Sequence, residues 1–273
     1  MNPDVLWWSI LGFLLSICGA GPGGIEPPEP PWTPASLPSV VAFVDAREGL
    51  EVADGGAVTG WAEQITGETL LNTYVTDDSR RPTKGVVGVH FAPASPYVPA
   101  QWLRASGQRM LPNGLTFWWV SRYTSTKSVH NHSQNCPLTV MSESSVNTFV
   151  GAGFSGDALC YSVFTSSGWS QTTFGSGYND GAARLFVVSH ATDGTLTAYV
   201  DGAQVGTTTK DYYATYMSWS SIGTGYRAEP TDTYGGDDGM DGDVSAAGVE
   251  GAPITADALA HLVTWTDQQG LVP

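Results

Sequence analysis

Residues 184–205 read RLFVVSHATDGTLTAYVDGAQV. Two apolar runs, residues 184–189 and 196–200, are separated by Asp193-Gly194, and Asp201-Gly202 separates the second run from residues 204–205. Asp-Gly between strand-like segments is typical of tight hairpin turns. This stretch therefore predicts an antiparallel meander and makes an all-β domain the expected fold.

Short apolar runs bounded by Gly, Asn, Asp or Ser recur on both sides of this meander. They predict strands at residues 40–45, 58–62, 86–91, 115–123, 138–142, 148–151 and 159–164. Thr255 is a good N-cap for residues 256–266, whose apolar spacing near 3.6 predicts the one convincing helix of the globular part. Six residues are expected to face the core of two packed sheets: Phe117, Trp119, Phe186, Val188, Leu196 and Ala198.

The composition of the 273-residue chain agrees with many short strands and tight turns. It contains 33 Gly and 17 Pro, with 11% aromatic and 14% charged residues. Its 11 Lys and Arg against 26 Asp and Glu give a net charge of −15, which repels a phosphate backbone. We therefore exclude nucleic acid as a partner.

Residues 5–20 read VLWWSILGFLLSICGA and carry no charge, so residues 1–20 predict an N-terminal hydrophobic helix. Three interpretations stay open: an uncleaved anchor held by lipid or by other protein chains, a cleaved signal or lipoprotein leader, and a buried helix of the same domain. A secretory signal usually begins with Lys or Arg, and none precedes this run. The expected anchor residues are Leu6, Trp7, Trp8, Ile10, Leu11, Phe13, Leu14 and Leu15.

Residues 21–39 are rich in Pro and Gly, which predicts an extended, semi-rigid stalk. A hydrophobic anchor, a stiff spacer and a globular domain over residues 40–273 follow one another in the order that surface display requires. We expect residues 1–38 to contact other chains of an assembly or lipid. Deletion of residues 1–38 is expected to release a soluble, folded domain.

Several motifs resemble those of the concanavalin A-like, or laminin-G-like, jelly-roll domains of secreted bacterial proteins and phage particles. Residues 194–202 (GTLTAYVDG) are similar to the hairpin of that family, and Asp241-Gly242-Asp243-Val244 is similar to its closing strand. The resemblance covers about residues 40–270. It implies a two-sheet antiparallel jelly-roll sandwich with a short C-terminal helix, and it implies fold more strongly than activity.

Glucanases of this fold class carry their catalytic acids as Glu-x-Asp-x-x-Glu, and that spacing is absent here. We therefore expect a protein that is not an enzyme. Carboxylates brought together only by the fold would still permit a secreted glycan-active enzyme, which stays open as an alternative.

Aromatic residues in or beside loops rich in Ser, Thr, Gly and Asn suggest a glycan site, because aromatic faces pack against the C–H groups of a pyranose ring. The alternative is that half of the aromatic residues belong to the core. The candidate glycan-binding residues are Trp169, Tyr178, Tyr212, Tyr213, Trp219, Tyr226 and Tyr234.

A Gly-rich acidic run suggests a calcium site, since clustered carboxylates are hard oxygen ligands. The same run also suits a plain turn that enters the closing strand, and on that alternative chelation changes little. No other cofactor is expected. The candidate calcium ligands are Asp237, Asp238, Asp241 and Asp243.

Three cysteines are too few for a disulfide scaffold and lack the spacing of a zinc site. Cys136 and Cys160 lie in apolar, strand-like stretches, so they either pair in an oxidising compartment or remain as buried thiols.

These features together predict a surface-displayed, non-catalytic adhesion or glycan-binding module on a virus particle or in a cell envelope, in an extracellular setting. A purely structural decoration or fibre protein of a virus particle is the alternative from a different class. A glycan array separates the two.

Overall fold

The computed structural model describes residues 31–53, 56–71, 81–85, 87–92, 103–124, 135–142, 148–165, 168–212, 216–222 and 242–273. The chain divides into two compact units, Met1–Trp32 and Thr33–Pro273, and the described helices and strands all belong to the second. The predicted anchor residues lie outside the described residues. Within the described ranges, no helix is both long and apolar enough to cross a membrane.

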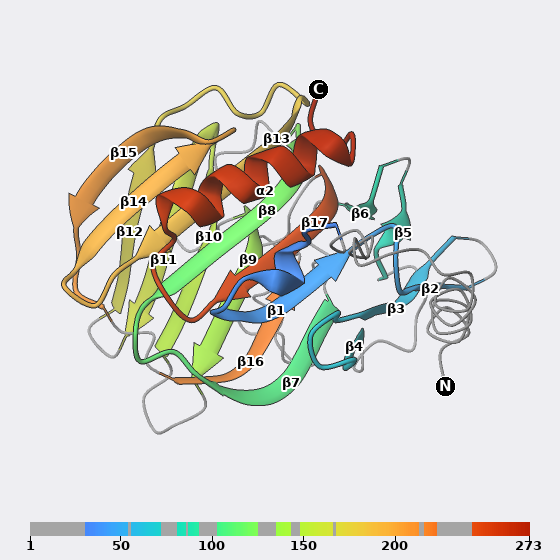
Figure 1. Ribbon diagram of the computed structural model, residues 1–273, viewed down its shortest axis with the longest axis horizontal. Coiled ribbons are helices and arrows are strands. Elements are labelled where there is room, and N and C mark those ends of the chain that lie inside the picture. The colour runs from blue at the N-terminus through green and yellow to red at the C-terminus, as the bar shows by residue number, and fades with distance from the viewer. Residues whose placement is uncertain are drawn as a thin grey trace, which may run out of the picture. The chain divides into compact units, whose positions relative to one another are not determined.

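The second unit is built from two antiparallel β-sheets and one α-helix, stacked in three layers (Figure 1). The eight-stranded sheet runs β15-β14-β13-β8-β17-β6-β5, with β1 also paired to β17. Its strands are β1 (Val40–Asp45), β5 (Thr83–Lys84), β6 (Val89–Phe91), β8 (Leu115–Tyr123), β13 (Ala183–His190), β14 (Thr195–Val200), β15 (Ala203–Thr209) and β17 (Gly242–Glu250).

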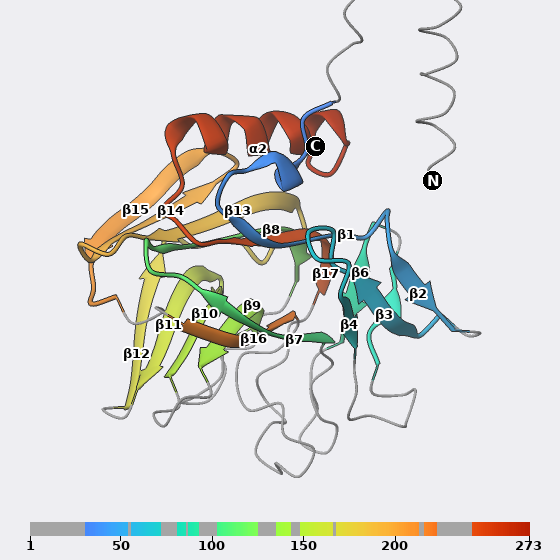
Figure 2. The same cartoon turned by 60° about the horizontal axis from the view of Figure 1, so that its bottom comes forward.

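The nine-stranded sheet runs β12-β11-β10-β9-β16-β7-β4-β3-β2 and faces the eight-stranded sheet (Figure 2). Its strands are β2 (Leu50–Val52), β3 (Val58–Ala62), β4 (Thr69–Leu71), β7 (Leu103–Met110), β9 (Asn135–Ser142), β10 (Thr148–Ser155), β11 (Ala158–Thr165), β12 (Gly168–Phe174) and β16 (Tyr216–Ile222). Among the described residues, the helices are the 3-10 turn η1 (Pro34–Ser36) and α2 (Ala256–Gln268).

The core lies between the two sheets and is built around stacked aromatic rings. Trp119 of β8 is the register partner of Phe186 of β13, and their ring centroids are 5.4 Å apart. Phe154 enters from the opposite sheet and meets both rings edge-on, at 6.0 Å from Trp119 and 4.9 Å from Phe186. The six residues predicted to face the core are all fully buried in this one cluster, so that prediction is confirmed.

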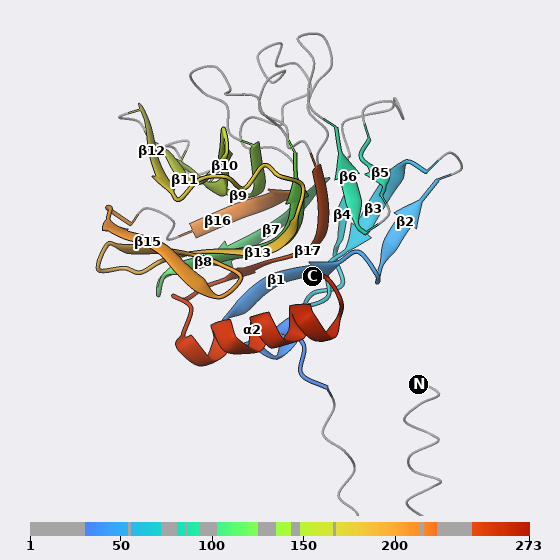
Figure 3. The same cartoon turned by 90° about the horizontal axis from the view of Figure 1, so that it is seen from above.

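The helix α2 covers the face of the eight-stranded sheet that points away from the nine-stranded sheet (Figures 1 and 3). The predicted N-cap is confirmed, since the Thr255 hydroxyl accepts a hydrogen bond from the Ala258 N–H at 3.1 Å. Trp265 packs edge-on against Phe43 and Trp118, at 5.8 Å and 6.1 Å between ring centroids. Gly248 makes room for this layer, because a Cβ there would lie 2.4 Å from the Trp118 ring. The helix is thus docked by a second, smaller aromatic cluster.

The predicted strands are present, and most extend by a few residues. Two strands rich in Ser and Thr, β12 and β16, were expected to be loops. Both mix polar residues on their two faces, so they lack the apolar alternation that marks a strand in sequence. Their hydrogen-bonding partners β11, β9 and β7 supply the pairing instead.

The end of the predicted stalk packs against the sandwich. Pro34 and Leu37 are buried, and the Ser39 hydroxyl donates to Glu250 Oε2 at 2.9 Å. The compact unit accordingly begins at Thr33, and a deletion of residues 1–38 would remove η1 with these two side chains. A truncation after Trp32 keeps this contact intact.

The alternative of a Cys136–Cys160 disulfide is wrong, because Cys160 is a free, buried cysteine. Cys136 belongs to β9 and Cys160 to β11, and β10 runs between these two strands. Two strand spacings are about 9–10 Å, which is beyond the reach of a disulfide.

Candidate functional site

The face of the nine-stranded sheet that points away from the eight-stranded sheet is the candidate ligand surface. We call it the outer face. Val150 and Ala152 of β10, and Tyr161 and Val163 of β11, belong to the core between the sheets. Because successive residues of a strand lie on opposite faces, the residues between them lie on the outer face.

Large apolar residues occupy five neighbouring register positions across this outer face. The pairing runs from β16 through β9, β10 and β11 to β12, over about 19 Å at the usual strand spacing. We call these residues the aromatic row: Trp219, Met141, Phe149, Phe164 and Trp169.

A polar row lies beside the aromatic row, two residues further along each strand. It holds Arg104, Ser221, Thr139, Gly151, Ser162 and Gln171, of which Gly151 and Ser162 are buried. Gln171 is exposed, and its Nε2 donates to the Sγ of Cys160 at 3.0 Å. Burial raises the pKa of Cys160 to about 11, so this cysteine stays a protonated thiol with little nucleophilic character.

The predicted glycan residues fall into three groups. Trp169 and Trp219 lie in the aromatic row, on strands and not on loops. Tyr178 and Tyr212 pack against the core between the sheets. The other three predicted residues lie outside the described ranges: Tyr213, Tyr226 and Tyr234.

The Tyr178 ring and the Tyr212 hydroxyl make contacts within the protein. The Tyr178 ring meets Phe186 edge-on at 5.7 Å, and the Arg184 guanidinium lies 5.9 Å from the Tyr178 ring centroid. The Tyr212 hydroxyl donates to the Leu111 carbonyl at 2.6 Å. Both therefore stabilise the sandwich, as the core alternative for the aromatic residues expected.

A buried histidine near the edge where β12 and β15 meet is held in one tautomer. His190 Nε2 lies 2.8 Å from the Lys210 carbonyl, which can only accept, so Nε2 carries the proton. The unprotonated Nδ1 then accepts from the Tyr161 hydroxyl at 2.7 Å. Burial lowers the pKa of His190 and raises that of Tyr161, which keeps both groups neutral.

We expect His190 to make the protein less stable as the pH falls. The pKa of His190 is lowered in the folded state, so the unfolded chain binds more protons than the folded chain below about pH 6.5. The free energy of unfolding therefore decreases as the pH falls, by at most about 1.4 kcal/mol per pH unit. Urea unfolding of the wild type and of His190→Gln at pH 7.5, 6.5 and 5.5 checks this. The stability difference between the two should shrink toward pH 5.5, and a difference independent of pH would contradict it.

Two buried glutamates are engaged in structural contacts. Glu63 accepts hydrogen bonds from the N–H groups of Phe43, Ile65 and Thr66 at 2.7–2.8 Å, and from the Thr66 hydroxyl at 2.6 Å. Glu250 is 2% exposed, accepts from Ser39, and has a pKa raised by burial. Neither carboxylate is placed to reach a substrate in solvent.

Of the predicted calcium ligands, only Asp243 is described. It lies in β17, and its Oδ1 is 2.9 Å from Nδ1 of His90. No cluster of three or more metal-binding side chains occurs among the described residues. Asp237, Asp238 and Asp241 lie outside them, so the calcium site stays a prediction.

The arrangement of strands defines an antiparallel jelly-roll β-sandwich. Among solved structures, the chain is similar to the sialidase of Trypanosoma rangeli in complex with sialic acid, at TM-score 0.56 and 13% identity over 84% of this chain and 33% of that chain. It is also similar to the binding domain of botulinum neurotoxin serotype D, at TM-score 0.52 and 5% identity over 83% of this chain and 52% of that chain.

The chain thus spans about a third of the sialidase and about half of the toxin domain. At these identities the likeness shows the fold alone. No protein-family model matches the sequence, and no curated protein sequence matches it.

Proposed function

We propose that this protein is a non-catalytic glycan-binding module of the concanavalin A-like kind, which binds its ligand on the outer face of the nine-stranded sheet. The observation that carries the proposal is the aromatic row, which crosses five strands at consecutive register positions. A binding surface on this face would use such a set of residues, because contiguous apolar patches on a protein surface mark interaction sites.

The chemistry of the two rows suits an oligosaccharide. Aromatic rings offer flat faces to the C–H groups of a sugar ring, and side-chain oxygens and nitrogens offer partners to its hydroxyls. The aromatic row supplies the first kind of group, and the exposed Gln171 of the adjacent polar row supplies the second. A span of about 19 Å accommodates several sugar units, so the ligand is a chain and not a single monosaccharide.

The similar structures support this choice of ligand class, since one of them is a sialidase in complex with sialic acid. The role of Glu63 and Glu250 in internal contacts supports a non-catalytic module. The apolar run and Pro-rich segment of residues 1–38 support display from a virus particle or cell envelope, with other chains or lipid as the partner.

Glycan binding by the full chain tests the proposal. On an array, we expect selective binding to one class of oligosaccharide, and Trp169→Ala and Trp219→Ala should each weaken it at least about tenfold, because an aromatic side chain that anchors a ligand carries about 2 kcal/mol. Tyr199→Ala is the matched control, since Tyr199 lies on the face of β14 that points away from the core.

Unfolding midpoints close to the wild-type value will show that these variants still fold. Loss of binding in Tyr199→Ala as well, or no effect of either tryptophan, would contradict the proposed surface. Absence of glycan binding would favour a structural decoration or fibre. Mass spectrometry that finds the bound glycan cleaved would contradict a non-catalytic role.

A further inference from the structure

Charge is distributed unevenly over this acidic protein, which carries 26 Asp and Glu against 11 Lys and Arg. Among the described residues, the strands of the nine-stranded sheet contain one acidic residue, Glu51 in the edge strand β2. They contain two basic residues, Arg104 and Arg109, and both belong to β7. The five strands that carry the aromatic row contain no Asp, Glu, Lys or Arg. The sheet that bears the proposed glycan surface is therefore basic where the protein as a whole is acidic.

The two arginines flank the β16 end of the aromatic row, which is the position of Trp219. Arg104 is the register partner of Ser221, and Arg109 is the register partner of Met217. Ser221 and Met217 lie two residues on either side of Trp219, so they share its face of β16. Each arginine thus lies one strand across and two residues along from Trp219, about 8 Å between Cα positions.

The strands place no carboxylate next to either arginine. The register partner of Arg104 in β4 is Leu71, and the partners of both arginines in β16 are uncharged. Glu51 lies in the same row as Arg104, but three strands away, which is about 14 Å. Along the strands, the positive charge at this end of the outer face is therefore not offset by a neighbouring acid.

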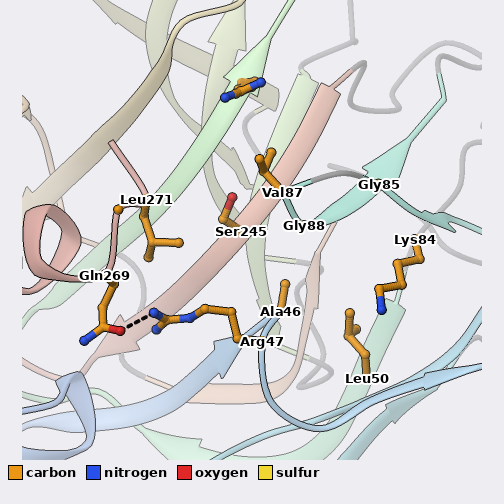
Figure 4. A pocket seen from close by; sticks show the side chains of 12 residues that line it. Ala46, Arg47, Leu50, Lys84, Gly85, Val87, Gly88, Ser245, Gln269 and Leu271 are labelled. Carbon is orange, nitrogen blue, oxygen red and sulfur yellow. Dashed lines mark hydrogen bonds between the residues drawn. The ribbon is translucent and has the colours of Figure 1, made fainter. Parts of the chain in front are cut away.

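The basic residues of the cavity at the end of α2 offer no such arrangement. This cavity has a volume of about 390 Å3, and its basic residues are Arg47, Lys84 and Arg122. Arg47 is bonded to Gln269 (Figure 4) and paired with Asp45, at 2.8 Å from Nε to Oδ1. Asp243 is the register partner of Arg122, and Lys84 lies three strands away in β5. The positive charges of this cavity are thus offset by acids or far apart.

A guanidinium group binds a carboxylate or a sulfate through paired, charge-assisted hydrogen bonds, which are stronger than bonds to a neutral hydroxyl. An anion is repelled by most of this acidic molecule, so it approaches where negative charge is least. A nucleic acid stays excluded, because it carries a phosphate at every unit and two arginines cannot offset that repulsion. An oligosaccharide with one acidic unit needs positive charge at one point only.

We propose that the glycan bound on the outer face is acidic, and that its charged sugar unit, with a carboxylate or a sulfate, lies over Trp219 and pairs with Arg104. Arg104 is favoured over Arg109 because it belongs to the polar row, so a chain that follows the two rows reaches it at the β7 end. Arg109 adds positive potential on the other side of Trp219. This inference rests on the proposed glycan binding and names the ligand class of that site.

An array that holds neutral oligosaccharides beside their sialylated, uronic acid and sulfated forms tests the inference with the full chain. We expect one or more acidic forms to bind at least about tenfold more tightly than the neutral parent, as a hydrogen bond to a charged group predicts. Sialylated and uronic acid forms against sulfated forms distinguish carboxylate from sulfate. Arg104→Gln should remove this preference, and raising the salt from about 0.02 M to about 0.3 M should reduce it.

Arg122→Gln is the matched control, because it removes the same charge from an exposed arginine in β8 of the other sheet. It should keep the wild-type preference for acidic glycans, and Arg104→Lys, which keeps the charge, should retain part of it. Unfolding midpoints near the wild-type value will show that the variants fold. Equal loss in Arg104→Gln and Arg122→Gln would indicate a general effect of net charge and overturn the inference, as would an unchanged preference in Arg104→Gln.

The same array separates this inference from the proposed function. Neutral glycans bound as tightly as acidic ones, with binding lost in Trp219→Ala, would overturn the acidic ligand and leave the glycan surface in place. No binding of any glycan would overturn both.

Discussion

Replacing Trp119 with alanine is expected to lower the free energy of unfolding by about 3–5 kcal/mol. The side chain is fully buried between the sheets, and its removal leaves the rings of Phe186 and Phe154 without their common neighbour. The surrounding rings are large and rigid, so the cavity cannot collapse easily. Urea unfolding at neutral pH measures this loss.

Trp119→Phe is the informative comparison. The indole Nε1 of Trp119 is buried and has no hydrogen-bond partner among the described residues. Phenylalanine removes this unsatisfied donor while it keeps most of the ring volume, so the loss of stability should be much smaller. Equal losses in the two variants would contradict the packing described here.

Replacing Trp265 with alanine is expected to cost about 3–5 kcal/mol as well, because it is the largest of the buried side chains that α2 packs against the eight-stranded sheet. Trp265 is 3% exposed, contacts Phe43 and Trp118 edge-on, and lies 5.4 Å below the Arg47 guanidinium. Loss of the ring should weaken the docking of the whole helix. Urea unfolding reports the stability, and hydrogen exchange in residues 256–268 reports the loosening of α2.

Thr264→Ala is the control on the same helix. Thr264 is exposed and its hydroxyl bonds only to the Ala260 carbonyl one turn earlier. Its replacement should change stability by no more than about 0.5 kcal/mol. An effect of Trp265→Ala as small as that of Thr264→Ala would show that α2 is not docked through the tryptophan.

The parts of the fold that sequence could predict are those set by neighbouring residues. The β13–β14–β15 meander follows from Asp-Gly turns between apolar runs, and α2 follows from the Thr255 cap and its apolar spacing. The buried positions of β8 and β13 follow from alternation of side chains along each strand. These features need no knowledge of the rest of the chain.

The candidate ligand surfaces depend on pairing between distant segments, which local patterns do not contain. Trp169 and Trp219 were singled out as aromatic residues, but their common row arises only because β9, β10 and β11 lie between their strands in a fixed register. Tyr178 and Tyr212 have sequence surroundings similar to those of the two tryptophans, yet they pack against the core.

The position of a bound glycan tests the central proposal most directly. We expect a crystal structure of the full chain with an oligosaccharide selected on the array to show sugar units along the outer face, across β16, β9, β10, β11 and β12, in contact with Trp219 and Trp169. A glycan bound away from the aromatic row, with that row covered by other parts of the protein, would contradict the proposed binding surface.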